Sequence, residues 1–193
     1  MICRLFLMFL IISFGGWAFE KIGGLLLYGN VGDRGFLTLP LCPIYGTTVL
    51  GIYFLMGTPK APRGVGACFF GEYEEQKTGQ RIIKYIVYFA AATILPTLAE
   101  FLVGGAFKLM GMPLWDYSEK PFNLFGVICL YYSFLWGVLI TLLMDFLWDR
   151  LYRLTERLSQ TLLLGISFSA GIVILGDFFA TTAATVNRFL SSR

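Results

Sequence analysis

Three acidic residues, Glu20, Glu100 and Asp177, stand inside long apolar stretches of the sequence. Ionisable side chains are costly in a bilayer, so each is a candidate functional residue. A helical rise of about 1.5 Å per residue, counted along each stretch, puts all three carboxylates roughly 22–24 Å from one membrane boundary. We therefore expect one shared polar site, where crowded carboxylates transfer protons or bind a cation. The alternative is that a lysine, a tyrosine hydroxyl or a backbone amide satisfies each carboxylate separately.

The motif PLWDYSEKPFN (113–123) supplies Asp116, Tyr117 and Asn123 as further candidates. Part of it is typical of a membrane interface, where tryptophan and tyrosine rings keep a polar edge in water. We expect Pro121 in the first turn of the following helix, with Asn123 capping backbone donors there. Anchoring alone gives Asp116 no role, so we interpret the motif as the lid of an outer-facing polar site.

A second motif, GDRGFLTLPLCPIYG (32–46), contains Arg34 among glycines and prolines. Glycine permits unusual backbone angles and proline fixes them, which favours a preformed pocket lip. Arg34 is suited to pair with Asp116, or with the phosphate or carboxylate of a ligand. An anchor to lipid phosphate is the alternative for this arginine.

The composition indicates a membrane protein. The 193-residue chain is 57% apolar and 14% charged, whereas a soluble domain has about 25% charged residues. No polar domain remains once the apolar stretches are set aside, so we expect one membrane domain, 1–193. The net charge of +3 suits a protein among anionic lipids, and without a dense basic patch it does not indicate nucleic-acid binding.

Metal and cofactor chemistry finds little support in the residue types. The chain has no histidine, which excludes histidine acid–base catalysis and histidine metal sites. The four cysteines, at 3, 42, 68 and 129, form no C-x-x-C pair. We therefore expect no metal and no cofactor. Buried free thiols are the simpler interpretation of the cysteines, and a Cys42–Cys129 disulfide is the alternative.

Five apolar segments approach the length of about 20 residues that a spanning helix needs. The sequence therefore predicts an all-α polytopic membrane helix bundle. The second segment is the weakest because it contains two prolines and three glycines, and it is either a short span or a re-entrant segment shielded by protein. The predicted segments are 3–27, 39–57, 84–110, 122–147 and 162–186.

Positive charges between the segments predict the orientation. With five spans and the N-terminus in the cytoplasm, loops 58–83 and 148–161 and Arg4 place nine positive residues inside and six outside. The first segment begins like a signal peptide but lacks a small-x-small cleavage site, so we expect an uncleaved helix. The stretch 145–160 has helical periodicity and is expected to continue the fourth helix.

Four stretches resemble, in order, the motifs of a bacterial membrane-protein family called ABC-transporter type IV, or permease-like: GGWAFE (15–20), RGFLTLPLCPIYG (34–46), WDYSEKPFNLFGVICL (115–130) and SFLWG (133–137). The resemblance covers roughly Gly15 to Gly137 and includes Glu20, Arg34 and Asp116 but not Asp177. It implies a permease component of the bacterial cytoplasmic membrane. It assigns no catalytic or substrate-binding residue.

A transporter role implies partners. The chain contains no G-x-x-x-x-G-K-[ST] motif, so an ABC role would require a separate ATPase subunit. Loop 58–83, with the sequence GEYEEQKTGQR, is the candidate dock, and an ordinary solvated loop is the alternative. Membrane lipids are expected partners, and a homo-oligomer remains open.

Three functions stay open from the sequence. The first is a transport-related membrane subunit. The second is a membrane-embedded enzyme acting on a lipid or lipid-linked substrate at the outer leaflet, with Glu20, Glu100 or Asp116 as acid–base group and Arg34 on an anionic headgroup. The third is a non-catalytic structural or regulatory membrane protein. No catalytic spacing favours the enzyme, so its catalytic residues are unknown.

Overall fold

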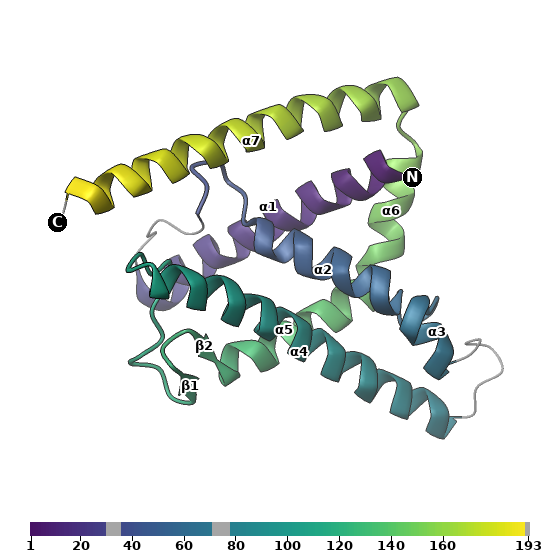
Figure 1. The fold of residues 1–193 in the computed structure, drawn as a ribbon. Helices are drawn as coiled ribbons and strands as arrows, with labels where there is room; N and C mark the ends of the chain where they lie inside the picture. The colour runs from purple at the N-terminus through teal and green to yellow at the C-terminus, as the bar shows by residue number, and fades with distance from the viewer. Residues whose placement is uncertain (30–35, 71–77, 192–193) are drawn as a thin grey trace.

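A computed structural model of the chain describes residues 1–29, 36–70 and 78–191, and these are mostly helical (Figure 1). One short antiparallel hairpin pairs β1 (Asn123–Leu124) with β2 (Ile128–Cys129), Asn123 lying opposite Cys129. A π-helical turn, η1 (Leu143–Leu147), joins two of the helices. The helices are α1 (Ile2–Tyr28), α2 (Pro43–Met56), α3 (Gly64–Phe70), α4 (Thr78–Leu109), α5 (Leu130–Leu142), α6 (Trp148–Glu156) and α7 (Gln160–Ser191).

Within the described residues, four stretches of helix are long and apolar enough to cross a membrane, which confirms the predicted all-α membrane bundle. They are Ile2–Leu26, Thr78–Leu109, Leu130–Glu156 and Gln160–Asn187. The chain starts at one end of the bundle, at the right of Figure 1, and finishes at the opposite end. We call these the N-terminal end and the C-terminal end.

The second predicted segment is not one continuous helix, since a non-helical stretch precedes α2; we call it the broken second segment. α2 has 14 residues, about 21 Å of helix, which is too short for a core of about 30 Å. It starts beside the middle of α1, where the Cys42 amide donates to the Ser13 carbonyl at 3.0 Å, and it ends at the N-terminal end. Residues 36–42, which we call the strap, lead into α2 without helical structure.

The core lies among α1, α2, α4 and the α5–α6 helix. Met8 and Ile52 are completely buried, and the Tyr53 ring packs on the Trp148 ring at 4.3 Å between centroids. The Tyr88 hydroxyl donates to the Gly57 carbonyl at 2.9 Å and so ties α4 to the end of α2. By contrast, α7 lies along the outside of the bundle and packs mainly on α1 (Figure 1).

The long helix from Leu130 bends at the π-helical turn. Lys60 donates to the Asp145 carbonyl at 2.7 Å, and the Asp145 carboxylate accepts from Tyr85 at 2.8 Å. Lys60 Nζ also lies 3.3 Å from Asp145 Oδ1. A π-turn disturbs the regular helical hydrogen bonds, and here a lysine supplies a donor to its backbone. Beyond the bend the predicted helical continuation extends as α6 to Glu156.

Two predicted boundaries were wrong. The fourth helix begins at Leu130, not at 122, because Phe122, Phe125 and Gly126 adopt left-handed backbone angles and the chain forms the β1–β2 hairpin first. Pro121 is therefore not in a helical first turn. The predicted polar loop 58–83 contains α3 and the first turns of α4, so the third spanning helix starts at Thr78 rather than 84.

Candidate functional site

Glu20 meets Tyr45 where α1 passes the start of α2. The Tyr45 hydroxyl donates a hydrogen bond to Glu20 Oε1. The contact requires α2 to begin deep in the bundle, which Pro43 favours because proline is preorganised for the first helical turn. Gly16 on α1 leaves the space that the Tyr45 ring occupies. The broken second segment thus places a tyrosine beside a carboxylate within the bundle.

Glu100 meets Tyr117 at the C-terminal part of α4. The Tyr117 hydroxyl donates to Glu100 Oε1 at 3.0 Å. Burial, followed by the Glu100 carboxylate and then Glu20, raises the pKa of Tyr117 well above its usual range. Tyr117 therefore stays a neutral donor. The Tyr117 ring packs on Tyr132 and the Tyr45 ring on Trp136, one helical turn apart on α5, so the two carboxylate–tyrosine pairs are neighbours.

Aromatic rings surround these two pairs. Trp136 on α5 lies 4.6 Å from the Tyr45 ring and 5.4 Å from the Phe19 ring, between centroids. Tyr132, one turn earlier, lies 5.5 Å from the Tyr117 ring. Glu20, Tyr45, Glu100 and Tyr117 are called the carboxylate–tyrosine cluster below. Its residues come from α1, α2, α4 and the loop after α4, so movement of any of these elements would alter it.

Asp177 lies apart from the cluster, against the strap. Its carboxylate accepts from the Thr38 amide at 2.9 Å, the Leu39 amide at 3.1 Å and the Thr38 hydroxyl. Non-helical backbone at membrane depth requires protein partners for its polar groups, and Asp177 is such a partner. Of the three acids expected to share a site, the structure brings Glu20 and Glu100 together and gives Asp177 a separate set of donors.

Asp116 and Asn123 hold the loop after α4 in shape. Asp116 Oδ1 accepts from the Ser118 amide at 2.9 Å and from the Ser118 hydroxyl, and these bonds lower the pKa of Asp116. The Asn123 side chain donates to the Lys120 carbonyl at 2.8 Å and accepts from the Gly126 amide at 3.2 Å. Arg34 lies outside the described residues, and the pairing of Arg34 with Asp116 stays a prediction.

Two polar residues of the folded bundle were not singled out in the sequence. Tyr45 belongs to the PIYG run, but its spacing gives no sign that it meets Glu20. Asp145 stands inside the fourth apolar segment, and the rule that selected Glu20 would also have selected it. Asp145 lies beside Tyr85 near the start of α4, whereas the carboxylate–tyrosine cluster includes Glu100 toward the end of α4, so the two are well separated along the bundle.

The described residues offer no obvious metal centre. Within 1–29, 36–70 and 78–191, no three histidine, cysteine, aspartate or glutamate side chains gather in a way that could hold a metal ion. Cys42 and Cys129 are both buried and both carry free thiols, so the alternative disulfide is absent from the structure. The chemistry available at the cluster is therefore that of carboxylates, phenols and aromatic rings.

A known protein family matches most of the chain. The family model described as "Putative ABC-transporter type IV" matches residues 7–182. The chain belongs to this family. The match includes all of the carboxylate–tyrosine cluster, the strap and Asp177. No curated protein and no solved structure matches the chain significantly. Membership of the ABC-transporter type IV family, together with four long apolar helices, makes this a multi-pass membrane protein of transporter type.

Proposed function

We propose that the chain is a permease-like subunit of a transporter and that the carboxylate–tyrosine cluster is part of its polar path. The observation that carries the proposal is the broken second segment, whose helix, α2, begins near Glu20. Discontinuous helices with polar groups at mid-membrane are typical of substrate and ion sites in transporters. A purely structural bundle has no need for two neighbouring carboxylate–tyrosine pairs within its apolar helices.

The charge distribution supports a cytoplasmic N-terminal end. Cytoplasmic segments of membrane proteins are enriched in lysine and arginine. Among the described side chains, the N-terminal end carries Arg4, Lys60, Arg63, Arg81, Lys84, Arg150, Arg153 and Arg157, whereas the C-terminal end carries Lys21, Lys108 and Lys120. In this orientation the carboxylate–tyrosine cluster belongs to the outer half of the bilayer, and the chain sits in the bacterial cytoplasmic membrane.

A separate ATPase subunit is the partner that this proposal requires. It would dock at the N-terminal end, where the 58–83 region and α6 lie. Much of the sequence GEYEEQKTGQR lies outside the described residues. Purification of the full chain in mild detergent, followed by mass spectrometry of bound proteins, tests the partnership. Recovery of an ATPase subunit in stoichiometric amounts is the expected result, and its absence from repeated preparations would count against a permease role.

The role of the cluster needs an independent experiment. Glu20→Gln and Glu100→Gln keep the side-chain shape but remove the carboxylate charge. We expect both variants to fold and to bind the ATPase, while ATP-dependent solute uptake by cells or vesicles falls at least tenfold. Glu119→Gln, in the same loop as Tyr117, is the matched control and should leave uptake unchanged. Normal uptake by both cluster variants would contradict the proposed polar path.

A further inference from the structure

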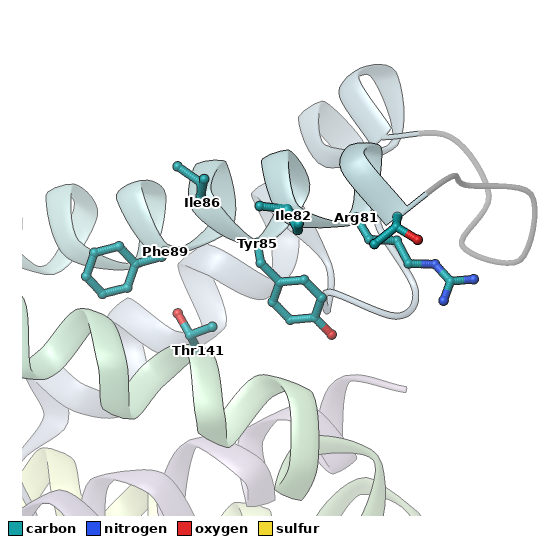
Figure 2. Close-up of a pocket in the computed structure, with 7 residues that line it drawn as sticks. Arg81, Ile82, Tyr85, Ile86, Phe89 and Thr141 are labelled. Carbon is teal, nitrogen blue, oxygen red and sulfur yellow. The ribbon is translucent and has the colours of Figure 1, made fainter.

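A surface groove lies between α4 and α5, and the proposed transport function does not involve it (Figure 2). Its volume is about 470 Å³, and it is an open surface groove rather than an enclosed cavity. Ile82, Ile86 and Phe89 of α4 form one wall, Tyr85 and Thr141 lie across from one another, and Arg81 lies at one end.

The walls of the groove present hydrocarbon almost exclusively. The Tyr85 hydroxyl is engaged by Asp145 at 2.8 Å, and the Thr141 hydroxyl donates to the Gly137 carbonyl at 2.7 Å. Ile82 and Ile86 are more than half exposed, at 57% and 61%. Since α4 is a membrane-spanning helix, these side chains face the bilayer interior, where the matching occupant is an acyl chain.

The groove also has a direction. α4 begins at Thr78, so Arg81 stands in its first turn, and Phe89 lies eight residues or about 12 Å further along the axis. Figure 2 shows the Arg81 guanidinium pointing toward the start of the helix, away from Phe89. The positive end of the helix dipole adds to the attraction for an anion near Arg81. Arg81 is therefore placed to contact the phosphate of a lipid whose acyl chain fills the groove.

We propose that the α4–α5 groove binds one anionic phospholipid, with an acyl chain along Ile82, Ile86 and Phe89 and the phosphate beside Arg81. Charge complementarity selects the anionic lipid, because the end of the bundle that holds Arg81 is rich in arginine and lysine. The lipid lies against Tyr85, which contacts Asp145 at the π-helical turn. The proposal holds whether or not the chain transports a solute.

Native mass spectrometry of the full chain in detergent measures the binding. The probes are phosphatidylglycerol and phosphatidylcholine with identical acyl chains, added in separate titrations. We expect tighter binding of phosphatidylglycerol, and Arg81→Gln should weaken it about fivefold, the effect of one arginine near an anionic headgroup, while phosphatidylcholine binding stays the same. Ile86→Trp fills the groove and should weaken the binding of both lipids.

Two matched variants complete the experiment. Arg157→Gln removes an exposed arginine from the N-terminal end, and Ile94→Trp enlarges another exposed isoleucine of α4; neither should change binding. Equal phosphatidylglycerol affinity for Arg81→Gln and the unmodified chain would overturn the proposal. Equal losses for Ile94→Trp and Ile86→Trp would also overturn it, since lipid would then coat α4 without a site. A dimer that Ile86→Trp dissociates would assign the groove to a second copy. Should Ile86→Trp fail to fold, the Arg81→Gln and Arg157→Gln comparison decides.

Discussion

Tyr117, in the loop after α4, donates a hydrogen bond to the Glu100 carboxylate at 3.0 Å. A side-chain hydrogen bond contributes about 0.5–1.5 kcal/mol, or about 1.5–3 kcal/mol to a charged group, and its loss leaves a partly buried acceptor unpaired. Tyr117→Phe should therefore lower the free energy of unfolding in detergent by about 1–3 kcal/mol. Tyr131→Phe, on a side chain that is 66% exposed, is the control and should change it little. Equal stability of the two variants would show that the bond contributes nothing.

Two glycines of α2 provide a test of how closely it packs on α1. A Cβ at Gly46 would lie 2.7 Å from the Phe9 carbonyl oxygen, which is backbone and cannot move aside easily, whereas a Cβ at Gly51 would meet nothing within 4 Å. Gly46→Ala should destabilise the protein by about 1–3 kcal/mol through overpacking. Gly51→Ala should be neutral or stabilising by up to about 1 kcal/mol, because alanine favours helix. Thermal unfolding of both variants measures the difference, and a destabilised Gly51→Ala alone would contradict the packing.

Asp177 is expected to protect the amides of the strap. It accepts hydrogen bonds from the Thr38 and Leu39 amides, so Asp177→Ala should leave both without their acceptor. Loss of about 1–2 kcal/mol should speed their hydrogen exchange roughly 5–30-fold. Asp149→Ala, on an exposed part of α6, should leave exchange in the strap unchanged. Unchanged exchange in Asp177→Ala would mean that other groups hold the strap.

The loop after α4 should depend on pH through Asp116. The Ser118 hydrogen bonds lower the pKa of Asp116 below its ordinary value of about 3.9. The ionised carboxylate therefore stabilises the loop fully above that value, and this contribution is lost as pH falls through the lower folded pKa. Fluorescence of Trp115, which donates to the Val127 carbonyl at 2.8 Å, can follow the acid transition. Asp116→Asn should remove the acid transition, and Ser118→Ala should move the transition to higher pH. The same transition in both variants and in the unmodified chain would mean that another group titrates.

Hydropathy predicted the spans, but neither hydropathy nor helical rise predicted the partners of the acids. The first and last predicted segments, 3–27 and 162–186, lie within α1 and α7. The helical rise gives the position of a residue along the helix axis, but not the direction in which its side chain points. Asp177 therefore shares a predicted level with Glu20 yet meets the strap instead, because α7 packs on the outside of α1.

The start of the fourth helix shows a second limit of sequence analysis. Residues 122–129 are apolar enough to be assigned to a span, and hydropathy does not distinguish a helix from a short hairpin. The hairpin depends on left-handed backbone angles at Phe122 and Phe125, which phenylalanine seldom adopts. The broken second segment was easier to anticipate, because its two prolines and three glycines disfavour a continuous helix.

The bond between the strap and α7 has a consequence for biosynthesis. Thr38 and Asp177 are separated by 139 positions, and α7 leaves the ribosome after α1 to α6. During synthesis the Thr38 and Leu39 amides thus enter the membrane long before their acceptor exists, at a cost in hydrocarbon. The strap forms its hydrogen bonds with Asp177 only after translation has passed residue 177. Assembly of the N-terminal half of the chain is therefore completed by α7.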